Sequence, residues 1–135
     1  MLRKTDFFID GKWVTPVTPK ELEVINPADE QPFAVISLGS AADVDKAVAA
    51  ARRAFESWSR TSRDERLAAL ERLLVSYNKR MNDMAKAISD EMGAPKKLAL
   101  NAQAGSGLGH LTATLEVLKN FEFEEMSGST MLRRE

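Results

Sequence analysis

The hydrophobic pattern of this chain changes its period at Ser40, and this change constrains the fold more than any other feature. Before Ser40, apolar residues come in short runs separated by turn residues, which is typical of strands and hairpins. After Ser40, they recur every three or four residues, which is the spacing of one face of an α-helix. The sequence therefore predicts a hairpin region over residues 1–39 and a helical region over residues 40–126.

Two hairpins are expected in the first region. The run FFIDGKWV extends from Phe7 to Val14, and the central Asp10-Gly11 pair suits the positive φ angles of a type I′ turn. Two further strand runs, Leu22 to Asn26 and Phe33 to Leu38, are separated by the turn-forming stretch NPADEQP. We expect these two runs to pair with each other.

Capping signals mark the starts of two helices. Ser40 with Asp43, and Ser62 with Glu65, each have the spacing of a capping box. The apolar stripe of the first helix is Val44, Ala47, Val48, Ala51, Phe55 and Trp58. The stripe that follows Ser62 is Leu67, Leu70, Leu74, Tyr77, Met81, Met84 and Ile88.

The second stripe is compatible with one long helix or with two helices that meet near residue 80, where Asn82 would cap the new start. Gly93 and Pro95 end this stretch, as is usual at helix C-termini. The stripe is expected to be buried against the first and last helices. The last helix is indicated by Leu108, Leu111, Leu115, Leu118 and Phe121.

Glycines stand at every second position in AQAGSGLGH, at Gly105, Gly107 and Gly109. A dinucleotide fingerprint needs G-x-G-x-x-G after a buried strand, and a P-loop needs Gly-Lys-Ser or Gly-Lys-Thr. Neither condition is met, because the spacing is G-x-G-x-G and the preceding residues favour a helix. We interpret these glycines as a helix start or interruption where small residues permit close approach.

The composition leaves few catalytic groups. The chain has no cysteine and one histidine, His110, which is expected to face solvent or cap a helix. Thiolate catalysis and Cys-ligated zinc are therefore excluded within these residues. Nineteen basic residues against twenty acidic ones give no footprint for nucleic acid or an anionic membrane. No signal peptide or membrane span is recognisable, so a cytoplasmic protein is expected.

The order of these elements resembles the opening of an aldehyde dehydrogenase. The pieces that carry the resemblance are FFIDGKWV, EVINPADEQPFAVISLGSAADVDKAVAAARRAFESWS, RDERLAALERL and EMGAPKKLA. The resemblance implies an α+β fragment, mainly helical with N-terminal β-hairpins, that forms part of the larger α/β aldehyde dehydrogenase-like fold. It implies that this chain corresponds to the first part of an enzyme of several hundred residues.

The resemblance also implies the chemistry of the intact enzyme, which is an NAD(P)-dependent aldehyde dehydrogenase. Family members oxidise an aldehyde to a carboxylic acid with NAD or NADP, through a cysteine thiolate and a glutamate that helps water hydrolyse the thioester. The catalytic cysteine, the glutamate and the cofactor loop are expected beyond Glu135. This chain alone is therefore expected to bind no cofactor and to be inactive.

Two lesser sites are carried over from the family onto matching positions. An alkali cation is expected at the backbone carbonyls of Val24 and Ile25 and the side chain of Glu91, since oxygen ligands suit a hard cation. Gly109 and Ala113 on the last helix are expected to face the substrate tunnel, where two small residues would leave room for bulky aldehydes.

The tail over residues 127–135 resembles the start of a strand that joins the family's oligomerisation sheet, so a homo-oligomer is expected. An unpaired edge is an association hazard, and the chain alone is expected to self-associate. One alternative is a free-standing helical protein-interaction module, built on the Leu67 to Ile88 stripe, without catalysis. Another is a regulatory or pseudoenzyme fragment that binds a full-length partner.

Overall fold

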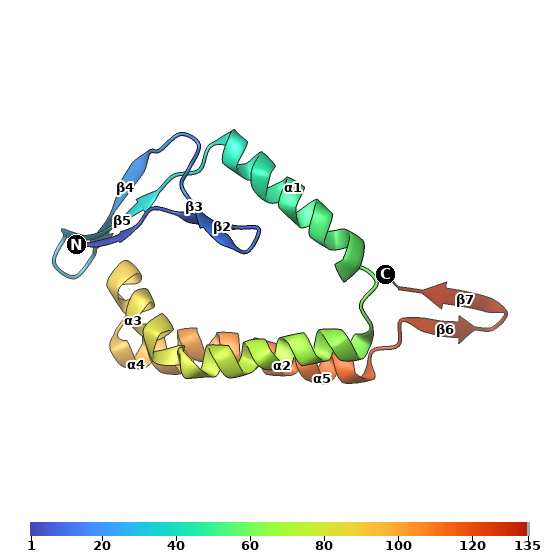
Figure 1. Ribbon diagram of the computed structural model, residues 1–135. Coiled ribbons are helices and arrows are strands. Elements are labelled where there is room, and N and C mark those ends of the chain that lie inside the picture. The colour runs from blue at the N-terminus through green and yellow to red at the C-terminus, as the bar shows by residue number, and fades with distance from the viewer. Residues whose placement is uncertain (135) are drawn as a thin grey trace.

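The computed structural model describes residues 1–134, so Glu135, the end of the expected oligomerisation strand, lies outside the described residues. The elements form an open ring (Figure 1). A small sheet and a hairpin occupy one side, a single long helix crosses the top, and a pair of long helices lies along the bottom.

The small sheet has the strand order β1-β5-β4. Strands β4 (Glu21–Asn26) and β5 (Gln31–Ser37) form the antiparallel hairpin that the sequence predicts. Strand β1 (Leu2–Lys4) was not predicted, and it pairs with β5 in parallel. The second hairpin consists of β2 (Phe7–Ile9) and β3 (Lys12–Val14). Its turn residues Asp10 and Gly11 have φ angles of 55° and 74°, as a type I′ turn requires.

Both predicted capping boxes are present. Helix α1 (Ala41–Trp58) begins at the Ser40–Asp43 box, and helix α2 (Arg63–Lys79) begins at the Ser62–Glu65 box. In each box the serine hydroxyl accepts a backbone N–H while the acid accepts the serine N–H, which satisfies two donors that the helix itself leaves free.

Two helices meet near residue 80, because α2 ends at Lys79 and α3 (Met81–Met92) follows. Arg80 occupies the position before α3 and makes no side-chain cap, so the expected cap by Asn82 is wrong. Helix α3 ends at Gly93, whose φ of 70° is the left-handed conformation that favours glycine.

The last helical segment is longer than predicted. It starts with α4 (Lys96–Leu98), passes through the π-helical turn η1 (Ala99–Ala104) and continues as α5 (Gly105–Asn120). A hairpin of β6 (Glu124–Ser127) and β7 (Thr130–Arg133) follows. The boundary expected after residue 126 therefore falls inside β6, since the acidic FEFEE stretch leads into a strand of its own.

Helix α2 packs against α5, as expected, and the two lie side by side in Figure 1. The expected packing of α2 against α1 is wrong, because the ring holds the two helices apart (Figure 1). The apolar stripe of α1 remains open, with Val44, Val48, Phe55 and Trp58 each about half or more exposed.

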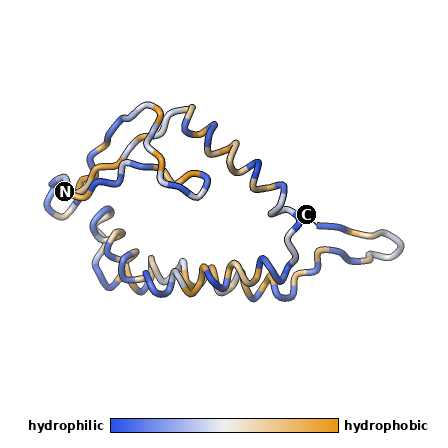
Figure 2. The backbone as a smooth tube through the Cα atoms, viewed as in Figure 1, coloured by the Kyte–Doolittle hydropathy of each residue, from blue (hydrophilic) through white to orange (hydrophobic). Residues whose placement is uncertain are grey.

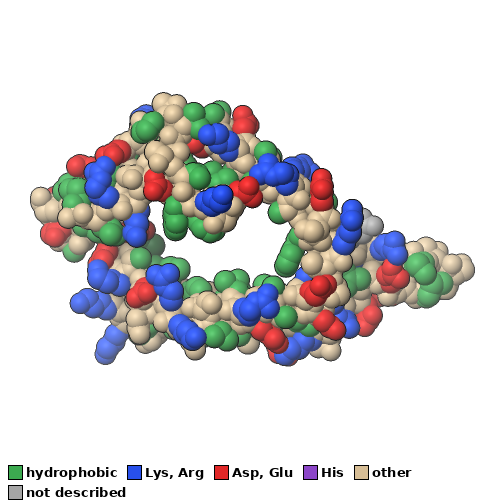
Figure 3. Space-filling model, in the orientation of Figure 1, with side chains coloured by type: hydrophobic (Ala, Val, Ile, Leu, Met, Phe, Trp, Pro, Cys, Tyr) green, Lys and Arg blue, Asp and Glu red, His purple; other side chains and the backbone are tan. Residues whose placement is uncertain are grey.

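Large buried side chains are scarce in this fold. A helical core cluster consists of Ala85, Ala99 and Ala104, with Met81, Ile88, Ala94 and Leu100 packed around it. In the described residues, no large side chain is fully buried. Hydrophobic stretches alternate with hydrophilic ones along every helix in Figure 2, and Figure 3 shows hydrophobic side chains lining the opening of the ring.

Candidate functional site

Helix α5 carries an apolar groove at its C-terminal half. The groove has a volume of about 420 Å³ and is lined by Ala113, Thr114, Val117, Leu118, Phe121 and Phe123. Two of these residues, Phe121 and Phe123, have their rings 4.9 Å apart in an edge-to-face arrangement. The groove can therefore accept an apolar chain, and Ala113, predicted to face a tunnel, is one of its wall residues.

Gly109 lies one helical turn before Ala113 on the same face of α5. A Cβ built on Gly109 would meet no atom within 4 Å, so this position opens into free space. Gly109 and Ala113, the two residues assigned to the tunnel from the sequence, are thus neighbours on an exposed face of α5, and both are small.

The surroundings of Gly107 explain the glycine motif by close helix packing and not by phosphate binding. A Cβ on Gly107 would lie 2.3 Å from the hydroxyl oxygen of Tyr77 and 2.7 Å from its Cζ. The Tyr77 ring on α2 therefore lies directly on the backbone of α5. The interpretation of these glycines as a place of close approach is confirmed at Gly107, which lies within a helix.

The Tyr77 hydroxyl donates a hydrogen bond of 2.9 Å to the carbonyl oxygen of Ala104, at the last residue of η1. Ala104 is completely buried. Beside it, the π-turn directs the N–H of Gly105 to the carbonyl of Leu100, five residues back. Gln103 in the same turn has a buried Oε1 with no hydrogen-bond partner. A π-turn within an α-helix is uncommon and frequently marks a functional position.

The expected cation ligands lie on two elements that contact each other, β4 and α3. The ladder register shifts between Val24 and Ile25, and Ile25 faces Pro32, which has no N–H to donate. Pro32 therefore donates no ladder hydrogen bond to β4 at this point. Glu91 is exposed near the end of α3.

The contact between these two elements is tight at Gly93. A Cβ on Gly93 would lie 2.8 Å from Cγ of Pro27, the residue that follows β4. Two carbonyls and a carboxylate are oxygen ligands of the kind that a hard cation takes. In the described residues, no group of three or more His, Cys, Asp or Glu side chains forms a metal site.

Asp43 is the one buried charged side chain in the described part of the chain, at 5% exposure. Its Oδ1 accepts the N–H of Val17 at 2.8 Å, and its Oδ2 accepts the N–H and the hydroxyl of Ser40 at 2.9 and 2.7 Å. The hydrogen bond from Val17, followed by those from Ser40, holds the pKa of Asp43 below its usual value. This carboxylate ties a loop to the start of α1 and is structural.

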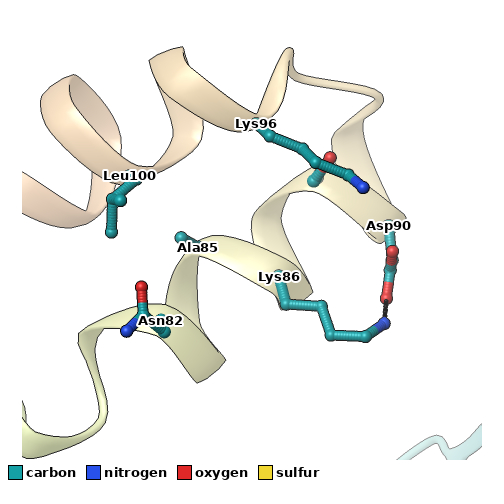
Figure 4. Close-up of a pocket in the computed structure, with 7 residues that line it drawn as sticks. Asn82, Ala85, Lys86, Asp90, Lys96 and Leu100 are labelled. Carbon is teal, nitrogen blue, oxygen red and sulfur yellow. Dashed lines mark hydrogen bonds and ion pairs between the residues drawn. The ribbon is translucent and has the colours of Figure 1, made fainter.

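A pocket of about 330 Å³ lies between α3 and the start of the last helical segment (Figure 4). Lys86 pairs with Asp90 on its rim, and Lys96 extends across it from α4. Leu100 and Ala85 supply its apolar lining from two different helical segments. None of the residues assigned to a site from the sequence lines this pocket.

Sequence reasoning missed Tyr77 as a contact residue and placed it only in an apolar stripe. Its signal was nevertheless present, since Tyr77 is the only tyrosine of the chain and a phenol hydroxyl inside a helix interface needs an acceptor. The π-turn has no comparable signal, because its residues ALNAQA are ordinary helix formers. His110 is exposed on α5, as expected.

Comparison with known proteins identifies relatives of this chain. The profile described as "Aldehyde dehydrogenase family" matches residues 13–135. The 3-succinoylsemialdehyde-pyridine dehydrogenase of a Pseudomonas species is 50% identical over 131 residues, which are 96% of this chain and 28% of that protein. The chain therefore spans less than a third of the length of this curated relative.

Solved structures agree with this result. The crystal structure of an aldehyde dehydrogenase from Bartonella henselae superposes with a TM-score of 0.93 at 49% identity, over 96% of this chain and 27% of that one. A mutant of aldehyde dehydrogenase C from Pseudomonas syringae, solved with NAD+ and octanal, gives a TM-score of 0.93 at 40% identity. The match covers 97% of this chain and 27% of that one.

Proposed function

Because this chain belongs to the aldehyde dehydrogenase family, we propose that it is the N-terminal portion of an oxidoreductase that oxidises an aldehyde to a carboxylic acid with NAD or NADP. The observation that carries the proposal is the match of nearly the whole chain to about a quarter of several aldehyde dehydrogenases. NAD is supported by the Pseudomonas syringae relative, whose structure contains NAD+.

The chain itself supplies no thiolate nucleophile, since it has no cysteine. We assign to the rest of the enzyme the thiolate, the glutamate and the cofactor site. The contribution of this chain is structural: helices that flank the cofactor-binding region, one wall of the substrate entrance, and a hairpin for oligomer contact. Alone, it neither binds the cofactor nor oxidises an aldehyde.

A hybrid enzyme tests this proposal. Residues 1–135 are joined to the remaining part of the 50% identical Pseudomonas relative, and NADH formation is followed with octanal and with acetaldehyde. The folded hybrid is expected to form NADH, while residues 1–135 alone form none. A folded hybrid that binds NAD but oxidises no aldehyde would contradict the proposal.

The groove at Ala113 is proposed as the part of the substrate entrance that accommodates the aldehyde chain. Ala113→Met in the hybrid fills this space with a flexible side chain, because Ala113 is a wall residue of the 420 Å³ groove. We expect kcat/KM for octanal to fall by about tenfold, equivalent to about 1.4 kcal/mol, with little change for acetaldehyde. Thr112→Met, on an exposed neighbouring position outside the groove, is the control. An equal effect on both aldehydes would remove the assignment.

Val24, Ile25 and Glu91 are proposed to hold an alkali cation at the contact of β4 with α3. The cation would supply a charge that neutralises Glu91 and joins the two elements. Glu91→Gln is expected to abolish the increase in thermal stability of the hybrid on adding potassium or sodium, while Asp83→Asn at the other end of α3 leaves it intact. If the unmodified hybrid melts at the same temperature in choline and potassium salts, no such site exists.

The alternative of a free-standing interaction module depended on the Leu67 to Ile88 stripe. The α2 portion of that stripe is half-buried where α2 packs on α5, and Met81 and Ile88 pack around the alanine cluster. Most of the stripe is thus used inside the chain, so the structure gives this alternative no free surface of the expected kind.

A further inference from the structure

The contact of Tyr77 with α5 fixes that helix at two points. The hydroxyl donates to the Ala104 carbonyl at 2.9 Å, and the ring occupies the space that a side chain at position 107 would need. Ala104 and Gly107 are three residues apart, which places both on the same face of the helical segment. One side chain therefore restricts both the rotation and the sliding of α5 against α2.

The position of this contact along the helix matters as much as its geometry. It lies where η1 passes into α5, and the π-turn puts one additional residue into the helix there. One additional residue changes the direction of all later side chains by about 100° relative to a regular helix. The π-turn, held by Tyr77, thus determines which residues of α5 face outward.

The downstream residues of α5 show what this rotation controls. Leu115 is buried, while Ala113 and Val117 on either side of it line the apolar groove. Ala113 lies nine residues after Ala104, or about 14 Å along a helix. A rigid helix transmits a rotation at η1 over that distance, and a change of rotation would replace Ala113 in the groove wall by a neighbour such as Thr112, which lies outside the groove.

We propose that Tyr77 is a positioning residue for aldehyde selectivity, which acts by fixing the rotation of α5 and thereby the wall of the Ala113 groove. The inference rests on the proposed function, because it takes the groove to hold the chain of the aldehyde. Tyr77 is not one of the residues that line the groove, so its effect on the groove passes through α5.

Tyr77→Phe in the hybrid enzyme removes the donor and keeps the ring. The expected result is a change in KM for octanal of about threefold or more with kcat unchanged, and a KM for acetaldehyde that stays within about twofold. Thr112→Val is the matched control, since the Thr112 hydroxyl also donates to a carbonyl of the same segment, that of Leu108 at 2.9 Å, without any tie to α2. It should change neither KM.

Gly107→Ala displaces the ring by a second route and separates positioning from stability. This variant is expected to shift KM for octanal as Tyr77→Phe does, and also to lower the melting temperature. Adding Tyr77→Leu to Gly107→Ala removes the steric conflict, so the melting temperature should recover while KM for octanal stays altered. If the melting temperature and KM for octanal both return to their original values, the proposal is overturned, because the change in KM would then follow from lost stability alone.

Hydrogen exchange of the hybrid provides a readout independent of activity. Tyr77→Phe should speed exchange in peptides that cover residues 99–112, and leave peptides from α1 unchanged. If exchange is unchanged, or if KM shifts equally for both aldehydes, Tyr77 does not position α5. A hybrid with Tyr77 in place that oxidises no aldehyde would instead defeat the proposed function, and the exchange result would still decide whether Tyr77 holds α5.

Discussion

At the scale of single residues, Asp43 shows how one carboxylate can hold two segments together. It accepts hydrogen bonds from the loop residue Val17 and from Ser40, and it completes the capping box of α1. Each of these bonds stabilises the charged form, so the pKa of Asp43 lies below its ordinary value of 3.8. The carboxylate also lies at the N-terminus of the helix, where negative charge is favoured.

This geometry predicts a pH dependence of stability. Because the pKa is lower in the folded chain than in the unfolded chain, the stabilisation by Asp43 is fully present above about pH 4 and is lost as the pH falls through the folded pKa. Asp43→Asn should therefore lower the melting temperature of the hybrid at pH 7 by a few degrees. The difference in melting temperature between the variant and the unmodified hybrid should become smaller in acid, as measured by circular dichroism.

Asp45→Asn is the matched control for this prediction, because Asp45 is in the same helical turn but exposed. It should have little effect at either pH. If Asp43→Asn lowers the melting temperature by the same amount at pH 7 and at pH 3, the shape of the side chain, and not its charge, stabilises the cap.

At the scale of elements, the fold is most predictable where local chemistry determines it. The Asp10-Gly11 turn and the boxes at Ser40 and Ser62 were correct because their residues act on backbone groups two or three positions away. Strand β1 was missed because a parallel partner 32 residues along the chain, as for Leu2 and Ala34, leaves no local pattern.

The candidate site was predictable to a smaller extent. Spacing excluded a phosphate cradle at the glycines, and the structure explains Gly107 by its contact with Tyr77. Gly109 and Ala113 came from the family resemblance, because neither residue has reactive chemistry that a pattern could reveal. The π-turn that sets the direction of Gly109 and Ala113 depends on the packing of Ala99 and Ala104 against α3. Such tertiary packing leaves no pattern in the local sequence.

The contact between α3 and β4 gives a prediction at this scale. Gly93→Ala introduces a Cβ at a φ of 70° and 2.8 Å from Pro27 Cγ, so it combines backbone strain with a steric conflict. We expect the free energy of unfolding of the hybrid to fall by about 1–3 kcal/mol in urea denaturation.

Gly109→Ala provides the comparison within the same chain. Gly109 is inside α5 with open space around it, so alanine should be tolerated or stabilise the helix by up to about 1 kcal/mol. If both substitutions have the same effect on the urea midpoint, the contact of Gly93 with Pro27 does not contribute to stability.

At the scale of the whole molecule, the chain buries little apolar surface by itself. Its buried hydrophobic residues are mostly alanines, whereas Phe8, Trp13, Phe55 and Trp58 remain about half or more exposed. Phe55 and Trp58 face a hollow of about 680 Å³ beside the β6–β7 hairpin. No helix in the described residues is long and apolar enough to cross a membrane. Exposed apolar surface of this extent marks contact with other protein.

The ring and the hairpin together predict that the 135-residue chain self-associates in solution. The open apolar stripe of α1 favours contact between copies, and β6 and β7 form a two-stranded sheet with Met126 and Met131 exposed. Light scattering should give a mass of at least twice 14.9 kDa at working concentrations.

Two charge variants distinguish the surfaces that drive this association. Val48→Lys with Phe55→Lys disrupts the α1 stripe, whereas Met126→Lys with Met131→Lys disrupts the hairpin surface; circular dichroism confirms that each retains its helices. The hairpin variant should return the chain toward a monomer if the hairpin surface drives association, and the α1 variant should do so if the apolar stripe drives it. A monomeric mass for the unmodified chain would contradict the prediction, because an exposed apolar surface of this extent would then be stable in water without a partner.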